Sequence, residues 1–229
     1  MTTSWSPQDH VRHWMYADVG KVLSAEFPLL PARRLSVLDF GSQWFGDPDG
    51  GWATPMRSML KVVLGGQMDH ILATYPEYNI ENLLPQIPPG ATYDIVIADQ
   101  VLEHVGKPWR AVAELARVVR PTGYVMVATP GLYPVHPSPL DCWRILHDGY
   151  RVLFPAHLWD YRTLGAWGSS AQLAYEIDSN GAFPYGPPTT TVEHAQAFQH
   201  YADAYDGRWP LMLWFVGRRR AAAIRGDEW

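Results

Sequence analysis

The sequence has little that could cross-link the chain or anchor it in a membrane. Cys142 is the only cysteine among 229 residues, which excludes an internal disulfide and a metal site built from several thiolates. No apolar stretch approaches the roughly 20 residues of a membrane-spanning helix, and the first residues lack the basic and apolar regions of a secretory leader. We therefore expect a cytoplasmic protein with no membrane partner.

The chain also lacks an excess of positive charge. It has 18 Lys and Arg against 23 Asp and Glu, which gives a net charge of −5. Nucleic-acid binders usually carry a basic stripe, so we expect no nucleic-acid partner. The densest basic run, Arg218-Arg219-Arg220, follows an apolar stretch, and we interpret it as a solvated strand end.

Apolar and aromatic residues are plentiful. A hydrophobic content of 47% in 229 residues is enough for one substantial core, so we expect a single domain over residues 1–229. The 11 tryptophans have two readings: they pack the core, or some of them line an aromatic substrate pocket. Those expected in loops or at helix ends are Trp44, Trp52, Trp109, Trp143, Trp167 and Trp209.

Hydrophobic periodicity and turn signals predict alternating strands and helices. Such alternation favours an α/β fold with a mostly parallel sheet. A long stretch rich in Gly, Pro and Tyr, residues 168–210, is expected to form a cap within the domain, with a helix over 192–205. The predicted helices are 5–30 (within an N-terminal segment, 1–30), 53–64, 108–119 and 143–154, and the predicted strands are 35–40, 69–74, 93–98, 124–128, 161–167 and 211–217.

Residues 93–130 are the most informative part of the chain. The apolar strand YDIVIA is followed by a polar edge, Asp99-Gln100, and then by LEHV. A helix with one apolar face ends at Pro121 and Gly123, and a second buried strand begins there. This order predicts a βαβ crossover, whose ligand crevice lies beyond the carboxyl ends of the strands.

The same segment resembles class I S-adenosylmethionine-dependent methyltransferases, of type 11. In that family the pattern reads roughly FDxVxxxxxLEHVxxPxxAxxExxRVLRPGGxxxxxxP, and the likeness extends over residues 35–155. It implies a Rossmann-like sheet with flanking helices and an antiparallel last strand. It also implies S-adenosylmethionine as cofactor and transfer of its methyl group.

The resemblance implies a cofactor loop after the first strand. The family motif VLDxGxGxG corresponds to VLDFGSQWFG here, with Gln43 in place of the second glycine. Glycine lets the backbone turn sharply and approach a ligand. Asp39, Gly41 and Ser42 would hold the methionine end of the cofactor. The full set expected in this loop is Asp39, Phe40, Gly41, Ser42, Gln43 and Gly46.

The family usually has an acidic residue after the second strand to bind the ribose. Thr74 occupies that position, and Glu77 is the nearest carboxylate; it either binds the ribose or is a solvated loop residue. Asn79 would lie beside the adenine, and Asp99 and Gln100 beside the sulfonium. The short segment before Asp94 predicts an abbreviated second helix and third strand.

The acceptor side is expected after the predicted strand 124–128, which corresponds to the fifth strand of the family. Similar methyltransferases carry HxxPxDxWR, and His136, Pro139, Asp141, Trp143 and Arg144 fill those places. His136 is the best candidate general base, with His104 and Asp141 as further catalytic candidates. Each also has a structural reading: a loop contact for either histidine, and an N-cap of the following helix for Asp141. Arg144 would form an ion pair.

We expect no metal site, because His136 and Asp141 have no further clustered ligands. The leading hypothesis is methyl transfer to an oxygen or nitrogen of a small molecule, such as a sugar, an aromatic metabolite or a natural-product intermediate. A homodimer is compatible with it. Two alternatives stay open: a catalytically degenerate cofactor-binding module, favoured by Gln43 and Thr74, and a methyltransferase acting on a macromolecule.

Overall fold

The computed structural model describes residues 13–27, 33–40, 59–65, 67–135, 140–170, 173–174 and 206–221. Its α-helices are α1 (His13–Glu26), α3 (Pro108–Val118) and α4 (His147–Leu153), and residues 59–63 are also helical. Its strands are β1 (Leu35–Phe40), β2 (Met68–Ala73), β3 (Tyr93–Asp99), β4 (Val119–Pro130), β5 (Trp159–Trp167) and β6 (Met212–Arg219). Three 3-10 turns are η2 (Ile80–Asn82), η3 (Leu84–Gln86) and η4 (Leu102–His104).

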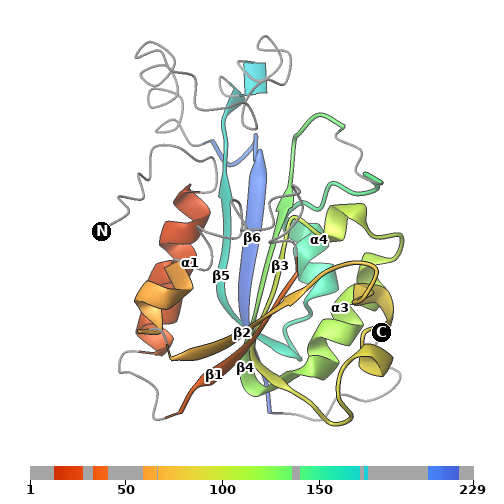
Figure 1. Cartoon of the computed structure of the whole chain (residues 1–229). Helices are drawn as coiled ribbons and strands as arrows, with labels where there is room; N and C mark the ends of the chain where they lie inside the picture. Colours follow the sequence, from red (N-terminus) through yellow and green to blue (C-terminus); the bar gives the residue numbers. More distant parts are fainter. Residues whose placement is uncertain are drawn as a thin grey trace, which may run out of the picture.

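The strands form one six-stranded sheet in the order β2-β1-β3-β4-β6-β5 (Figure 1). β2, β1, β3 and β4 pair in parallel, whereas β6 is antiparallel to both β4 and β5. The last strand is therefore the antiparallel one. This arrangement confirms the expected α/β, Rossmann-like class with a mostly parallel sheet.

Helices cover both faces of the sheet (Figure 1). α1 and the helical residues 59–63 lie on one face, and α3 and α4 on the other. Each face has its own apolar cluster: Val19, Leu60 and Val37 belong to the first, and Leu115 and Leu38 to the second. Because successive strand residues point to opposite faces, neighbouring residues of β1 serve both clusters.

The central crossover differs from its prediction at one junction. α3 ends at Val118, and β4 begins at Val119 instead of at Tyr124. Tyr93 pairs with Val119 and Ile95 with Tyr124, so the residues between these two pairs bulge out of the register. A bulge is how a strand accommodates such extra residues, and it lets the strand start directly at the helix end.

Two further segments test the sequence predictions. η2 and η3 are the only regular elements between β2 and β3, which confirms the abbreviated second helix and third strand. α4 begins at His147, four residues after the predicted start at Trp143. The expected helix over 192–205, most of the cap and residues 5–12 of the first predicted helix lie outside the described residues.

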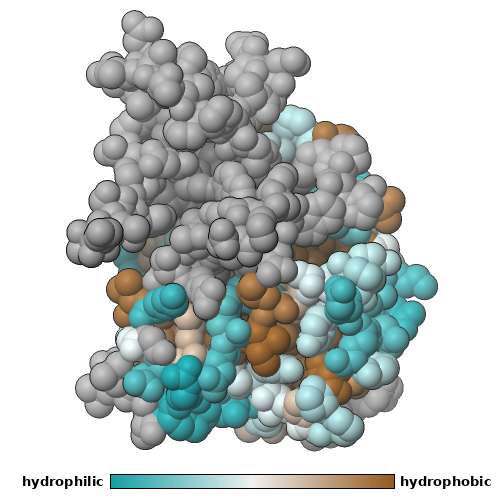
Figure 2. Space-filling model, viewed as in Figure 1, coloured by the Kyte–Doolittle hydropathy of each residue, from teal (hydrophilic) through white to brown (hydrophobic). Residues whose placement is uncertain are grey.

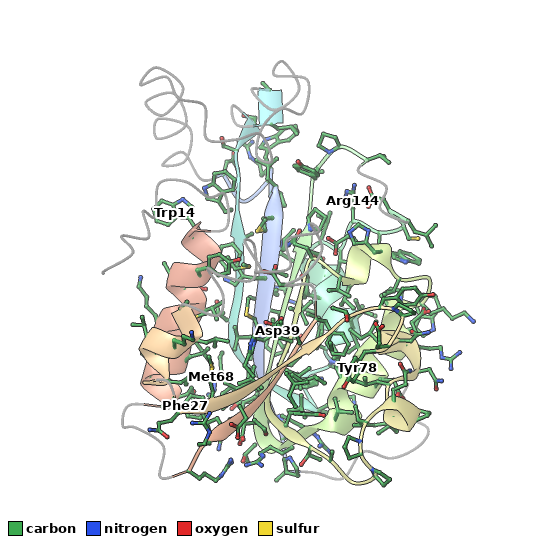
Figure 3. The ribbon with its side chains drawn as sticks, viewed as in Figure 1. Trp14, Phe27, Asp39, Met68, Tyr78 and Arg144 are labelled. Carbon is green, nitrogen blue, oxygen red and sulfur yellow. The ribbon has the colours of Figure 1, made fainter. Side chains whose placement is uncertain are left out.

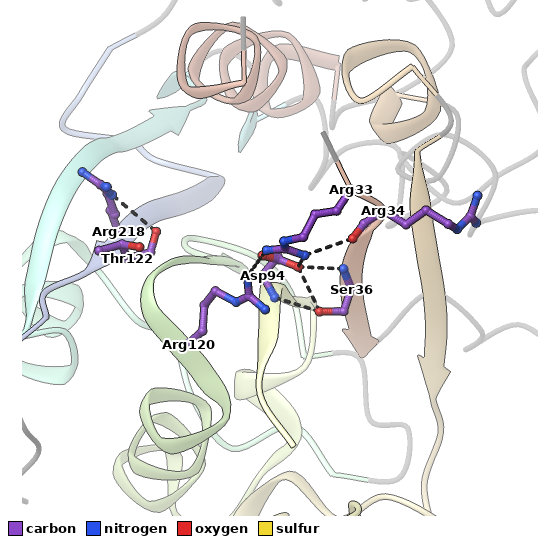
Figure 4. Close-up of polar contacts among 7 residues, drawn as sticks. All are labelled: Arg33, Arg34, Ser36, Asp94, Arg120, Thr122 and Arg218. Carbon is purple, nitrogen blue, oxygen red and sulfur yellow. Dashed lines mark hydrogen bonds and ion pairs between the residues drawn. The ribbon is translucent and has the colours of Figure 1, made fainter. Parts of the chain in front are cut away.

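A buried carboxylate fastens the amino-terminal ends of β1 and β3 (Figure 4). Asp94 Oδ2 accepts hydrogen bonds from Arg33 Nη1 at 2.8 Å, from the Ser36 backbone N at 2.8 Å and from Ser36 Oγ at 3.0 Å. Arg120 Nη1 lies 2.6 Å from Asp94 Oδ1. Two guanidinium groups therefore compensate one buried charge, at the end of the sheet opposite the carboxyl edge.

The visible face carries apolar residues in separate groups between hydrophilic ones (Figure 2). Exposed large apolar side chains elsewhere in the described chain include Val62, Tyr75 and Val152. Scattered exposure of this kind is ordinary for a folded protein surface. Every helix in the described part of the chain falls short of the length and apolar character that a membrane crossing needs.

Candidate functional site

A cavity opens at the carboxyl edge of the sheet. The register places Phe40, the last residue of β1, beside Ala73 of β2 and Ala98 of β3. A hollow of about 530 Å³ lies there, lined by Phe40 and Ala73, by residues between 74 and 81, and by residues between 101 and 106 together with Leu140. This volume falls within the usual range for small-molecule sites.

The lining combines flat apolar surfaces with a few polar groups. Phe40, Tyr78, Ile80 and Val101 provide aromatic and branched aliphatic surface, and Tyr78 lies toward the α3 side of the sheet in Figure 3. The polar lining residues are Thr74, Asn79, Glu81 and His104. An apolar slot with few polar groups suits a flat heterocycle that carries hydrogen-bonding edges.

Asn79 is held in place at the wall of the cavity. Its Oδ1 accepts a hydrogen bond from the Glu81 backbone N at 2.9 Å and caps η2. Its backbone N donates to Gln86 Oε1 at 2.6 Å. The next turn is tied to α3, because Glu114 Oε2 accepts from the backbone N of Leu83 at 2.8 Å. The amide oxygen of Asn79 has two lone pairs, and the capping bond uses one of them.

Glu77 does not line the cavity. Its side chain is exposed, and its Oε2 accepts a long hydrogen bond of 3.4 Å from Thr74 Oγ1. Thr74 itself lines the cavity. The two residues considered for the ribose are thus adjacent, with Thr74 nearer to the hollow.

Asp39 is paired with a histidine across the first two strands. The Nε2 atom of His70 lies 2.8 Å from Asp39 Oδ2, and the two side chains are 4% and 0% exposed. A carboxylate only accepts hydrogen bonds, so the Nε2 atom carries the proton. His70 was not foreseen from the sequence, because its partner is 31 residues away and is set by the register of β1 and β2.

Asp99 and Gln100 end β3 at the same edge. Tyr16 of α1 donates to Asp99 Oδ2 at 3.4 Å, and Gln100 Nε2 donates to Asp99 Oδ1 at 3.4 Å. Gln100 has a φ of 58°, and its backbone N bonds to Ala128 O at 2.9 Å. Non-glycine residues adopt such angles where surrounding contacts enforce them, and these positions concentrate at functional sites.

η4 is fastened to the segment that follows β4. The backbone O of Glu103 accepts from Cys142 N at 2.7 Å and from Trp143 N at 3.2 Å. His104 Nδ1 donates to the Leu140 carbonyl. In the neutral imidazole this leaves Nε2 unprotonated, and Nε2 lies 3.7 Å from Glu103 Oε1. Both readings of His104, loop contact and proton acceptor, are compatible with this geometry.

Asp141 is engaged by Arg144. Arg144 Nη1 and Nη2 donate to its carboxylate at 2.5 and 2.6 Å. The pKa of Arg144 is raised, and the hydrogen bond to Asp141 is the main cause. Arg144 also binds the carbonyls of Tyr133 and Pro134. The expected ion pair is confirmed. The expected N-cap is wrong, because the N-cap of α4 is Leu146 without a side-chain bond; residues 141–146 precede the helix without regular structure.

Several predicted residues fall outside the described chain: Gly41, Ser42, Gln43 and Gly46 of the cofactor loop, and the candidate base His136. Of the tryptophans expected in loops or at helix ends, Trp44 and Trp52 also fall outside. No tryptophan of the described chain lines the cavity; Tyr75 and Tyr78 supply its aromatic surface instead. These tyrosines follow β2 directly, which is the signal that could have identified them. In the described chain, no three His, Cys, Asp or Glu side chains gather as a metal site would require.

Comparison with known proteins shows which family the middle of the chain resembles. Residues 57–127 match the family model described as "Methyltransferase domain", of type 11. The match begins after β1 and ends within β4, so it includes most of the cavity wall but neither Phe40 and Leu140 nor the loop after Asp39.

Two curated relatives align over part of the chain. A probable S-adenosylmethionine-dependent methyltransferase of Mycolicibacterium smegmatis is 37% identical over 100 residues, covering 41% of this chain and 39% of the relative. A malonyl-[acyl-carrier protein] O-methyltransferase of Halalkalibacterium halodurans is 28% identical over 96 residues, covering 42% and 32%. The chain thus aligns with less than half of either relative's length.

A solved structure described as a SAM-dependent methyltransferase from Archaeoglobus fulgidus aligns with a TM-score of 0.48 at 10% identity. It covers 89% of this chain and 94% of that chain. S-adenosylmethionine is the cofactor that the family and the name of the Mycolicibacterium smegmatis relative specify. By the match over residues 57–127 and the alignment with these relatives, this part of the chain is similar to the methyltransferase domain of type 11.

Proposed function

We propose that this protein transfers a methyl group from S-adenosylmethionine to an oxygen or nitrogen atom of a small molecule. The observation that carries the proposal is the cavity at the carboxyl edge of β1, β2 and β3, most of whose lining residues belong to the segment that matches the methyltransferase family. Ligands of open α/β sheets bind at this edge.

The cavity fits the adenosine part of the cofactor. Ile80 and Val101 line it as branched aliphatic surfaces suited to a flat base. Asn79 offers an amide, which can accept from the exocyclic amine of adenine and donate to a ring nitrogen. Thr74 offers a hydroxyl to the ribose, a role in which it replaces the usual carboxylate.

The methionine end of the cofactor would lie toward Asp39, Asp99 and Gln100, at the ends of β1 and β3. When bound, S-adenosylmethionine supplies a methyl group on a positively charged sulfur. The acceptor's lone pair forms the new bond to carbon, the carbon–sulfur bond breaks, and its electron pair stays on sulfur. The residues of the site therefore need chiefly to align the acceptor and to remove its proton.

Removing that proton is assigned to His136, with His104 as the second candidate. Asp141 acts through Arg144, which also binds the carbonyls of Tyr133 and Pro134, so we regard Asp141 as a positioning residue. His136→Ala should lower turnover by about 100-fold or more, the usual contribution of a general base. The affinity for S-adenosylhomocysteine should stay within about twofold. Turnover equal to that of the wild type would contradict the role of His136.

A small acceptor is favoured over a macromolecule by charge. A net charge of −5 gives no electrostatic attraction to a nucleic acid backbone. The Halalkalibacterium halodurans relative is named as an O-methyltransferase, in keeping with an oxygen acceptor. A screen of small alcohols, carboxylic acids and amines, read as acceptor-dependent formation of S-adenosylhomocysteine, would identify the class.

A cavity-filling variant tests the site directly. Val101→Trp should fill the slot and reduce the affinity for S-adenosylhomocysteine at least tenfold, measured by calorimetric titration. Val152→Trp is the matched control, because Val152 is 78% exposed on α4. If Val101→Trp binds S-adenosylhomocysteine as tightly as the wild type, this cavity is excluded as the cofactor site. Absence of binding by the folded wild type would contradict the proposed function.

A further inference from the structure

One polar pair stands inside an otherwise apolar layer. On β2, Met68 packs in the cluster beneath α1, and His70, two residues on, points to the same face. On β1, Val37 belongs to that cluster, and Asp39 follows it on the same face. Figure 3 shows Asp39 over the sheet, with Met68 on the α1 side. His70 and Asp39 therefore meet where apolar side chains would be expected.

A buried His–Asp pair of this kind contributes little to the stability of the fold. Burying a carboxylate and an imidazole costs desolvation, and a well-packed apolar pair of similar volume is often as stable or more so. The arrangement is also incomplete as a core contact, because Nδ1 of His70 is buried and has no hydrogen-bond partner in the described part of the chain. A role other than stability accounts better for this pair.

The position of the pair indicates that role. Asp39 is the penultimate residue of β1, at the carboxyl edge, and the next residue, Phe40, lines the cavity. His70 lies opposite Val37 in the register, two residue pairs before Asp39 and Leu72 and on the same face of the sheet. The imidazole of His70 thus contacts the Asp39 carboxylate from the side that faces away from the carboxyl edge of the sheet.

We propose that His70 is a positioning residue of the cofactor site. By donating its Nε2–H to Oδ2, it fixes the Asp39 carboxylate at the strand end, where that carboxylate binds the α-ammonium group of the cofactor's methionine end. This inference rests on the proposed function. It assigns His70 to the amino-acid end of the ligand and not to its adenosine, which occupies the cavity.

The test compares two ligands that differ at that end. S-adenosylhomocysteine has the α-ammonium group, whereas 5′-methylthioadenosine keeps the adenosine and sulfur but lacks the amino-acid part. His70→Leu removes the donor at similar volume, and His70→Gln retains an N–H donor near the Nε2 position. His157→Leu is the control, because His157 is exposed and lies between α4 and β5. Calorimetric titration gives the dissociation constant of each ligand for each variant.

We expect His70→Leu to weaken S-adenosylhomocysteine binding about tenfold and 5′-methylthioadenosine binding less than twofold. His70→Gln should restore most of the loss, and His157→Leu should match the wild type. Equal weakening of both ligands would show that His70 only supports the fold, and unchanged affinity for both would show that it has no role; either result overturns the inference. If the folded wild-type protein binds neither ligand, that result would instead overturn the proposed function.

If His70→Leu does not fold, as judged by circular dichroism, Asp39→Asn replaces it. Removing the charge of the carboxylate should produce the same selective loss of S-adenosylhomocysteine. Combining Asp39→Asn with His70→Gln should then add little, because both changes act on one interaction. Fully additive losses would contradict the assignment.

Discussion

At the scale of single residues, the bulge before Tyr124 carries a local conformational cost. Thr122 is exposed and has a φ of 66°, a left-handed conformation that a β-branched residue rarely adopts. The family pattern has glycine at this place. The sequence therefore shows the deviation, whereas its backbone conformation becomes visible only in the structure.

Thr122→Gly should stabilise the protein by about 0.5–1 kcal/mol. Relief of the left-handed strain is partly offset by the greater freedom of glycine in the unfolded chain. The measurement is the midpoint of urea denaturation, compared at equal m-value. A lower midpoint for Thr122→Gly would contradict the strain argument.

The neighbouring Gly123 is the matched opposite case. A Cβ there would lie 2.9 Å from Asp94 O and 2.7 Å from Arg120 Cγ. Gly123→Ala should therefore destabilise the protein by about 1–3 kcal/mol, the usual cost of overpacking. The same urea titration measures it, and an unchanged midpoint would show that the bulge relaxes freely.

Residue-level prediction of the site succeeded unevenly for a physical reason. Asn79, Phe40 and His104 line the cavity, and each lies next to a recognisable strand end; their roles in binding or catalysis stay predictions. Tyr16 and His70 were not predicted as residues of the site. Their partners Asp99 and Asp39 are distant in sequence, and only the docking of α1 and the register of β2 bring them together.

At the scale of elements, α1 is joined to the sheet by a polar contact as well as by apolar packing. Tyr124 of β4 donates its hydroxyl to Glu26 at the end of α1, and Phe27 packs edge-on against the Tyr124 ring at 5.3 Å. Glu26 also pairs with Arg162 of β5 at 2.7 Å. These contacts fix the helix that carries Tyr16 to Asp99.

The Tyr124 contact predicts a loss of stability in alkali. Burial and the hydrogen bond to Glu26 raise the pKa of Tyr124 from 10.0 to about 12. Between pH 10 and 12 the unfolded chain releases this proton while the folded chain retains it, so stability falls as pH rises through that window. Below pH 10 the contribution is fully present.

Tyr124→Phe tests this element contact. Below pH 10 the variant should be less stable than the wild type by about 1 kcal/mol, the net value of a hydrogen bond. From pH 10 to 12 the difference should shrink. Urea denaturation at several pH values measures it, with Tyr75→Phe as control, because Tyr75 is 75% exposed. A difference that stays constant up to pH 12 would contradict the assigned pKa.

Element boundaries were predictable where periodicity was strong and failed where tertiary contacts decide. β1 was predicted at its observed bounds, 35–40. The start of α4 was placed too early, because the apolar and aromatic residues near Trp143 resemble a helix start. In the structure that segment forms the Asp141–Arg144 pair and the bonds to Glu103 O and is not helical, and sequence periodicity contains no sign of such contacts.

At the scale of the whole molecule, the alternation of strands and helices was sufficient to predict the α/β class, and the family resemblance implied the antiparallel last strand. The order β2-β1-β3-β4-β6-β5 then gathers the ends of β1, β2 and β3 at one edge. The cavity follows from this topology and from the abbreviated segment between β2 and β3, whose turns form its wall.

Ligand binding should stabilise the entire fold. S-adenosylhomocysteine at 100 times its dissociation constant should add about 2.7 kcal/mol to the free energy of unfolding, because it binds only the folded chain. For a chain of this size that corresponds to a rise in Tm of about 5–10 °C. Differential scanning calorimetry measures the shift, with adenosine as the weaker reference ligand. An unchanged Tm at saturating ligand would contradict a site formed by three strands of the sheet.

The most direct measurement is a crystal structure of the protein with S-adenosylhomocysteine. We predict the adenine in the cavity between Ile80 and Val101, beside Asn79, with the amino-acid end at Asp39 above His70. Ligand density at any other place, or a ligand whose adenine lies outside this cavity, would contradict the assignment of the carboxyl edge as the cofactor site.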